Sequence, residues 1–352
     1  MRKLFLFGIV VFALLSAACE HSDDVRIYGN WTKMVASEAV ERSGAVSFTI
    51  GTKAYVGLGI DKDLQELNDF WSYADGVWTK VENFPGEKRM GAVAFVLDGK
   101  AYIGGGYQPE NYSKEFVFFT DFYRFDPAAE PQWAKIEDFP GAARGDALAF
   151  ALNGKGYVGC GFDRRNRDLK DFWTYAEGKG WEKLEGFPGD PRRGGVAFVL
   201  ENKAYICTGE SNGRLALDMI SYEPAKNEWK KLHPLVNFNE KESFDDDYGE
   251  IPRAYTSCFL AKTSEGSRKA YIVSGFNSLT GRLLRSCWEY DARIDRWKRC
   301  SYFSSYERFQ AVGFSLGDYG YIGFGGISRD RGHFSDLWQF TPDVENDMKT
   351  KY

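Results

Sequence analysis

The chain repeats one short phrase six times, and the spacing of the copies limits what it can fold into. Each copy has a turn, then a tyrosine in a β-prone run, then a glycine; the tyrosines are Tyr55, Tyr102, Tyr157, Tyr205, Tyr271 and Tyr321. Successive tyrosines lie 47 to 66 residues apart. Repeats of this length with short strands predict the blades of a β-propeller rather than a solenoid.

Each repeat contains four strand-like runs. An arginine precedes the first run and the tyrosine lies in the second. An aromatic run such as 68–73 forms the third, and a tryptophan opens the fourth. β-Branched and aromatic residues favour strands, whereas glycine, asparagine and aspartate favour the turns between them. We therefore predict four strands per blade over residues 27–345.

The two ends of the repeat region complement each other. The last repeat has its third strand at 336–340 but no tryptophan after it, whereas Trp31 precedes the first repeat. Trp31 lies 47 residues before Trp78, which matches the repeat length. We expect residues 28–34 to complete the last blade, because closure of the ring hides the sheet edges that an open array would expose.

The arginine, the tyrosine strand with its following glycine, and the tryptophan stand where kelch repeats carry them, from about residue 26 to 345. The chain thus resembles kelch-repeat proteins, and the resemblance implies an all-β, six-bladed kelch-type β-propeller. One departure is that only the second residue of the usual glycine pair is regular; it is Gly59, Gly106, Gly161, Gly209, Gly275 and Gly325.

The first 18 residues read as a targeting segment. Arg2 and Lys3 precede a short apolar run, and small residues then lead to Cys19. Residues 15–19 resemble the lipobox of bacterial lipoproteins, which implies a signal peptide over 1–18, lipidation of Cys19 and a tether over 19–26. An ordinary secretory signal is the alternative, and the run is too short for a transmembrane helix. We expect a cell-envelope protein of the outer membrane, periplasmic or surface-exposed, that meets the membrane only through this anchor, with a C-terminal tail at 346–352.

Charge and composition exclude several functions. The formal net charge is −5, with both signs interspersed, which argues against a nucleic-acid-binding surface. The three histidines lie far apart and no two cysteines have CxxC spacing. We therefore expect no metal site and no cofactor. We also expect a monomer.

The strand register of the fifth repeat predicts a disulfide. If Tyr290 faces Trp297 as Tyr73 faces Trp78 in the first repeat, then Cys287 and Cys300 are directly opposed. Opposed residues have Cβ atoms about 4.5–5.5 Å apart, and the closer pairs approach disulfide reach. Because an exported protein meets an oxidising compartment, we predict a Cys287–Cys300 bridge; two buried free thiols are the alternative.

A set of arginines recurs before the tyrosine strand, at Arg42, Arg89, Arg144, Arg192, Arg253 and Arg308. Because the chain direction alternates, the connections that carry them should open on one face, around one mouth of the central channel. The guanidinium fork suits carboxylate, sulfate or phosphate, so we predict an anion site there. The alternative is a structural role, in which each arginine bonds to neighbouring loops.

The fourth repeat breaks the pattern after the regular glycine. Five repeats have an isoleucine, an aromatic residue or a glycine there, and the fourth has Glu210, with Arg214 four residues on. A carboxylate at the mouth can act as a general base if its pKa suits. The segment is similar to one in bacterial N-acetylneuraminate epimerases, which implies Glu210 as base and Arg214 as a ligand of the substrate carboxylate. Their long third-blade insertion is absent here, and an ion pair of Glu210 with an arginine is the alternative.

Three functions fit these observations. The first is a lipid-anchored binding module whose arginine-lined face takes a glycan, an anionic small molecule or a protein partner. The second is a sugar mutarotase or epimerase acting on an acidic sugar such as sialic acid, with Glu210 as base. The third is a non-catalytic envelope scaffold. The sequence favours the first, because it contains no clear catalytic constellation.

Overall fold

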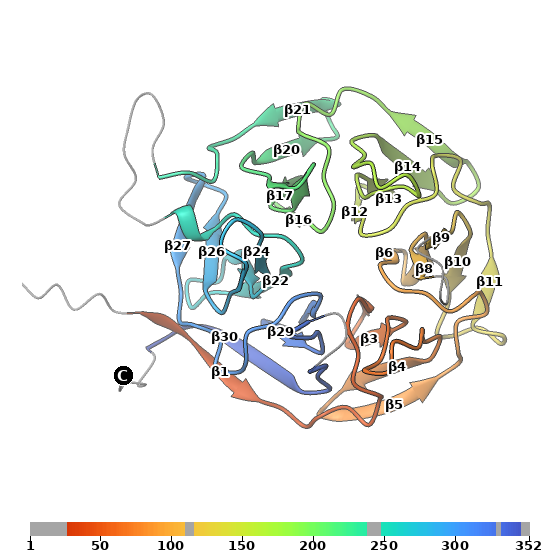
Figure 1. Cartoon of the computed structure of the whole chain (residues 1–352), viewed down its shortest axis with the longest axis horizontal. Coiled ribbons are helices and arrows are strands. Elements are labelled where there is room, and N and C mark those ends of the chain that lie inside the picture. The colour runs from red at the N-terminus through yellow and green to blue at the C-terminus, as the bar shows by residue number, and fades with distance from the viewer. Residues whose placement is uncertain (1–26, 110–115, 238–247, 329–331, 346–352) are drawn as a thin grey trace, which may run out of the picture.

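The computed structural model describes residues 27–109, 116–237, 248–328 and 332–345. The expected signal peptide at 1–18, Cys19, the tether at 19–26 and the tail at 346–352 lie outside these residues. Six four-stranded antiparallel sheets surround a central axis (Figure 1), as the repeats predict. No helix within the described ranges is long and apolar enough to span a membrane.

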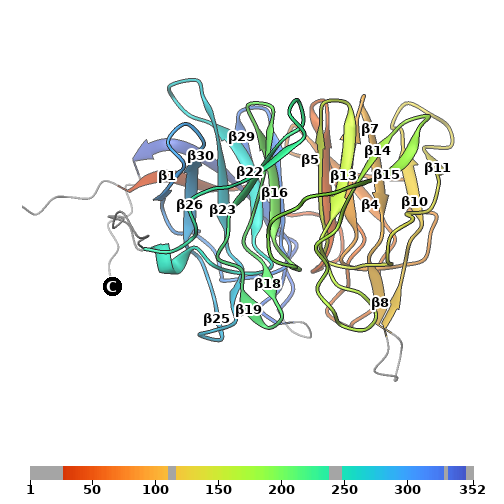
Figure 2. The same ribbon diagram turned by 90° about the horizontal axis from the view of Figure 1, so that it is seen from above.

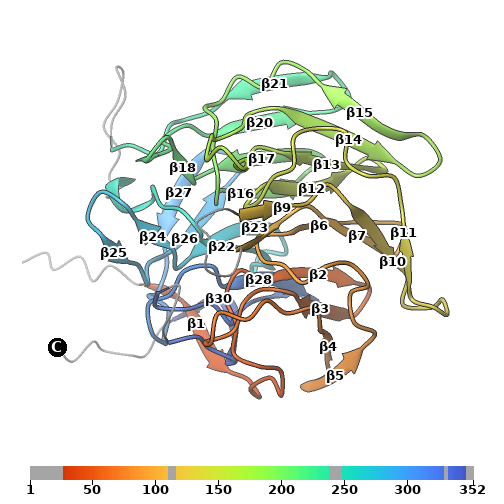
Figure 3. The same cartoon turned by 45° about the vertical axis from the view of Figure 1, so that its right-hand side comes forward.

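Strands follow one another from the axis to the rim in each blade (Figure 3). Blade 1 consists of β2 (Val46–Ile50), β3 (Lys53–Gly57), β4 (Phe70–Ala74) and β5 (Val77–Val81). Blade 2 consists of β6 (Val93–Leu97), β7 (Lys100–Gly104), β10 (Phe122–Phe125) and β11 (Trp133–Lys135). Blade 3 consists of β12 (Leu148–Leu152), β13 (Lys155–Gly159), β14 (Phe172–Ala176) and β15 (Gly180–Leu184).

The remaining blades repeat this order. Blade 4 consists of β16 (Val196–Leu200), β17 (Lys203–Cys207), β20 (Ile220–Glu223) and β21 (Glu228–Lys231). Blade 5 consists of β22 (Ser257–Lys262), β23 (Arg268–Val273), β26 (Cys287–Asp291) and β27 (Arg296–Arg299). Blade 6 consists of β28 (Val312–Leu316), β29 (Tyr319–Gly323), β30 (Leu337–Glu345) and β1 (Tyr28–Lys33).

Within the described residues, three small hairpins and one short helix interrupt the repeats. The hairpins are β8 (Tyr107–Pro109) with β9 (Phe116–Phe118), β18 (Glu210–Ser211) with β19 (Arg214–Leu215), and β24 (Phe276–Asn277) with β25 (Arg282–Leu283). They project from the same side of the wheel (Figure 2), which we call the hairpin face. The 3-10 helix η1 (Tyr248–Glu250) lies between blades 4 and 5.

The N-terminal strand closes the ring. β1 pairs antiparallel with β30, and Trp31 is the partner of Phe340 in that ladder. The Trp31 ring is only 6% exposed and lies 4.7 Å from the Phe340 ring and 5.0 Å from the Phe303 ring, centroid to centroid. The prediction that residues 28–34 complete the last blade is therefore confirmed.

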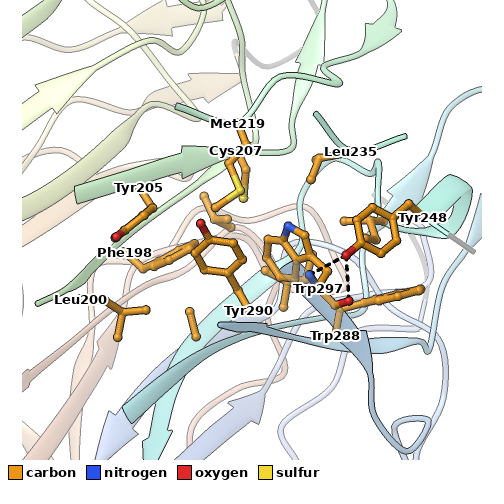
Figure 4. Packing of buried hydrophobic residues seen from close by; sticks show 14 residues of the cluster. Phe198, Leu200, Tyr205, Cys207, Met219, Leu235, Tyr248, Trp288, Tyr290 and Trp297 are labelled. Carbon is orange, nitrogen blue, oxygen red and sulfur yellow. Dashed lines mark hydrogen bonds between the residues drawn. The ribbon is translucent and has the colours of Figure 1, made fainter. Parts of the chain in front are cut away.

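The repeated tyrosine is a core residue. In every blade it faces a phenylalanine of the innermost strand, and the two rings are stacked, as for Phe150 and Tyr157 at 4.6 Å. The tyrosine then packs against the next blade: between blades 4 and 5, Tyr205 meets Tyr290 beside Trp297 (Figure 4). Aromatic pairs of this kind bury large apolar areas, which explains why each blade keeps the same residue.

The repeated tryptophan connects neighbouring blades. The indole N–H of Trp133 donates to the Glu82 carbonyl of the preceding blade at 3.1 Å, and Trp78, Trp181 and Trp229 make the equivalent bond at 3.3–3.4 Å. Blade 5 uses η1 instead. There the Tyr248 hydroxyl donates to the backbone carbonyl of Trp297 at 2.9 Å and accepts the backbone N–H of the same residue at 2.8 Å (Figure 4).

The two cysteines of blade 5 are opposed as the register predicts. Tyr290 pairs with Trp297, and the Cys300 N–H donates to the Cys287 carbonyl at 2.9 Å. Both thiols are buried and free in the structure, so the predicted bond is not present in it. Opposition brings the sulfurs within reach, but the bond also needs an oxidant. A hydrogen bond with Cys287, together with burial, raises the pKa of the Cys300 thiol.

The bridge remains a prediction for protein taken from an oxidising compartment. Unfolding without reductant, followed by maleimide labelling, should modify Cys160, Cys207 and Cys258 but spare Cys287 and Cys300. Prior reduction should expose all five. Full labelling of the pair without reductant would show that it stays as thiols.

Candidate functional site

The six repeat arginines are buried, with at most 2% of each residue exposed. Five form ion pairs with an aspartate that precedes the third strand of the same blade: Arg42–Asp69, Arg89–Asp121, Arg144–Asp171, Arg192–Asp218 and Arg308–Asp336. Their charge is therefore compensated inside the protein. The prediction that they line a ligand site is wrong, and the structural alternative is correct.

Blade 3 shows how this ion pair fastens the loops. Both Arg144 Nη atoms donate to Asp171, at 2.9 and 2.8 Å. Nη1 also donates to the Cys160 carbonyl, and Nε donates to the Ala142 carbonyl. Burial alone would raise the pKa of Asp171, but the bonds and charge of Arg144, with the Trp173 indole, lower it below its usual value.

Arg253 is the exception, because Ser286 occupies the place of the aspartate. Its guanidinium donates to the carbonyls of Ser274 and Ser286 at 3.0 and 2.9 Å, and to the Ser286 hydroxyl at 2.8 Å. No carboxylate of the described residues forms an ion pair with it. Burial lowers the pKa of Arg253 to about 10.

We expect Ser286→Asp to stabilise the protein. The new carboxylate would face the Arg253 guanidinium and recreate the ion pair of the other blades, a gain of roughly 1–2 kcal/mol. Denaturant unfolding at neutral pH measures it, with Ser286→Asn as the uncharged control. The gain should shrink as the pH falls below the unfolded value of about 3.9, because the contribution of a carboxyl with a lower folded pKa is lost as the pH falls through that lower value. A loss of stability at neutral pH would contradict the pairing.

A closed ring of backbone hydrogen bonds surrounds the axis. The residue two places after each repeat arginine donates its N–H to the carbonyl of its counterpart in the preceding blade, at 2.6–3.1 Å; the ring consists of Gly44, Gly91, Asp146, Gly194, Tyr255 and Gln310. All six have positive φ, between 48° and 63°. A cavity of about 160 Å³ lies on the axis at this ring.

Three positions of the ring carry side chains where the other three carry glycine. Positive φ is readily adopted by glycine, but it is uncommon for other residues and costs a bulky one such as Tyr255 of order 1–3 kcal/mol. Asp146, Tyr255 and Gln310 nevertheless occupy it. Residues held in such conformations cluster at functional sites, so the ring marks the channel mouth as a candidate site.

Charged groups of blades 3 and 4 act on the phenol of Tyr255, which lies just before the first strand of blade 5. Burial is the main cause that raises its pKa, and Asp146 and Glu210 raise it further, whereas Arg193 acts in the opposite sense. The Tyr255 hydroxyl makes no hydrogen bond to the described residues. We call Asp146, Arg193, Glu210 and Tyr255 the mouth cluster.

Glu210 lies in the mouth cluster, but Arg214 does not join it. In the β18–β19 ladder Glu210 is opposite Leu215, and Arg214 is opposite Ser211. Because side chains alternate along a strand, Arg214 lies on the other face of the hairpin, where it is exposed. The structure therefore does not bring Arg214 beside Glu210, where the resemblance to the epimerases placed it as a ligand of the substrate carboxylate. The Glu210 carboxylate has no hydrogen bond or ion pair within the described part of the chain.

The sequence prediction missed Arg193 and chose its neighbour Arg192. The Arg193 guanidinium bonds to Asp168 and to the Asn166 side chain, the latter at 2.7 Å, and lies 4.2 Å from the Phe162 ring centroid. It is the only charged residue directly after a repeat arginine; its counterparts are Ser43, Met90, Gly145, Ala254 and Phe309. Glu210 was found by comparing the same position in all six repeats, and this comparison at the position after the arginine would have found Arg193.

A larger hollow lies on the hairpin face beside the mouth. Its volume is about 1100 Å³, and its walls come from β9, from residues 142–143 and from residues 162–167. No group of three or more His, Cys, Asp or Glu residues that could hold a metal occurs in the ranges the structure covers.

The comparisons with known proteins identify the fold only. No family model matches the sequence, and no curated protein matches it. Among solved structures 696 chains match, one of them the structure of YjhT, with a TM-score of 0.68 and 14% identity over 86% of this chain and 95% of that chain. At this identity the likeness shows the class alone: an all-β, six-bladed, kelch-like propeller.

Proposed function

We propose that the chain is a ligand-binding module of the bacterial envelope, anchored through Cys19, that takes a glycan at the channel mouth on the hairpin face. The observation that carries the proposal is the mouth cluster: a carboxylate without a partner, a phenol and a second carboxylate gather where a ligand can enter. Such groups bind sugar hydroxyls as hydrogen-bond donors and acceptors. The repeat arginines take no part in it.

Titration calorimetry with neutral and acidic mono- and disaccharides tests the proposal. Glu210→Gln replaces a charged acceptor with a neutral amide, and Tyr255→Phe removes a hydroxyl, while both keep the shape of the side chain. Each change should weaken binding about tenfold, which corresponds to about 1.4 kcal/mol. Glu201→Gln changes an exposed glutamate in the turn between β16 and β17 of the same blade and should bind as the native protein does. Equal affinities for all variants would rule out the mouth cluster as the site.

A second candidate is sugar mutarotation. It is favoured by the Glu210 carboxylate, which lacks a partner and lies near the Tyr255 phenol. Ring opening needs a base that removes the proton of the anomeric hydroxyl and an acid that protonates the ring oxygen as its bond to the anomeric carbon breaks. Glu210 suits the first role and Tyr255 the second.

Exchange NMR of the anomers of an acidic sugar separates the two candidates. An enzyme should accelerate interconversion, and Glu210→Gln should remove the acceleration while Glu201→Gln keeps it. Sugar binding without any acceleration would leave the binding module and exclude the mutarotase for that sugar.

A further inference from the structure

The hollow beside the mouth has an aromatic floor. Phe116 and Phe118 of β9 are half-buried and pack on Tyr107 and Phe162, which are almost fully buried. The Phe118 ring centroid lies 5.1 Å from that of Phe162 and 5.4 Å from that of Tyr107. This support from below holds the two outer rings in place, so the floor presents ring surface to a ligand.

One wall of the hollow is a rigid basic loop. The Asp163 carboxylate accepts the N–H groups of Arg165 and Arg167 at 2.9 and 3.1 Å, and it also accepts the Arg167 guanidinium at 2.6 Å. Burial of Asp163 would raise its pKa, but these bonds lower it, so the carboxylate stays charged and keeps the loop fixed.

Two arginines on this loop have charges that no carboxylate of the described residues compensates. Arg164 and Arg165 both line the hollow and are exposed. Neither guanidinium has an ion pair or hydrogen bond to any residue that the structure describes. They differ in this from Arg167 and Arg193, whose charges are matched by Asp163 and Asp168.

We propose that this hollow binds an anionic glycan, with sugar rings stacked on Phe116 and Phe118 and carboxylate or sulfate groups on Arg164 and Arg165. A sugar ring has an apolar C–H face, and its acidic groups lie at the ring edge. An aromatic floor beside an arginine wall matches this distribution. A volume of about 1100 Å³ exceeds that of common small-molecule sites and suits an oligosaccharide.

The inference goes beyond the proposed function, since it uses none of the residues of the mouth cluster. It holds or fails independently: Glu210→Gln should leave binding in the hollow unchanged. If Glu210→Gln changes no affinity while R164Q/R165Q loses binding, the proposed function alone is refuted.

Calorimetry with three oligosaccharides tests it: a galacturonate oligomer for carboxylate, a heparin-derived oligomer for sulfate and a neutral dextran oligomer. The native protein should bind at least one acidic oligomer more than tenfold tighter than dextran. The double variant R164Q/R165Q should lose at least tenfold in affinity. K230Q/K231Q removes the same charge from the exposed outer strand of blade 4 and should stay within twofold of native.

Folding and alternative ligands are controlled in the same experiment. Both double variants change exposed side chains, so their thermal midpoints should equal that of the native protein. Phe118→Leu should weaken the acidic oligomers while the arginines remain. The proposal is overturned if no oligomer binds, or if the two double variants lose affinity equally. Tighter binding of single-stranded DNA or of an acidic, phenylalanine-containing peptide would also overturn it.

Discussion

Arg144→Ala should destabilise the protein by about 3–5 kcal/mol, because it leaves the Asp171 carboxylate without its cation and removes the bonds to the Ala142 and Cys160 carbonyls. Denaturant unfolding at neutral pH measures the loss. Arg164→Ala, in the same blade but exposed, should change the stability by no more than about 0.5 kcal/mol.

The stability difference between the native protein and Arg144→Ala should depend on pH. The pKa of Asp171 is lowered in the folded protein, so its contribution is present above the unfolded value of about 3.9 and is lost as the pH falls through the lower folded value. The gap between native protein and Arg144→Ala should therefore narrow below about pH 4. Replacing both partners, as in Arg144→Met with Asp171→Asn, should recover part of the loss. A gap that is constant with pH would show that the ion pair is not its cause.

Trp31→Ala should cost about 3–5 kcal/mol, the usual range for removing a buried large aromatic side chain. Trp31 packs on Phe259, Phe303 and Phe340, and it holds the strand that closes blade 6. Calorimetric or denaturant unfolding measures the effect.

A weakened closure should also promote association. If β1 detaches, β30 becomes an open edge that can pair with another chain. Light scattering should detect aggregates of Trp31→Ala before those of Val35→Ala, which alters an exposed residue just after β1. A loss below about 1 kcal/mol without association would mean that the other five blades close without this strand.

The sequence allowed much of the fold to be predicted, because each repeat is a local unit with its own strand and turn signals. Trp31 even revealed the closure, since a missing tryptophan at one end matched an extra one at the other. The disulfide prediction placed the two cysteines correctly, but the register of a hairpin carries no information about oxidation.

The site was harder to predict, because the direction and burial of a side chain depend on contacts between distant segments. The six arginines were assigned to a ligand, although five repeats have an aspartate before the third strand, which already indicated internal ion pairs; only the fifth repeat has a serine, Ser286, at that place. Arg214 follows Glu210 closely in the sequence, but the tight β18–β19 turn directs it away. The proximity of Asp146 and Tyr255 could not be predicted from the sequence, because it depends on how the blades are arranged in the closed ring.

The amide ring around the axis makes the wheel behave as one mechanical unit. Each of its six members is held to both neighbouring blades, so a blade that swings outward must break two of these bonds at once. A ligand bound to the side chains of this ring would consequently reduce the motion of blades with which it has no contact.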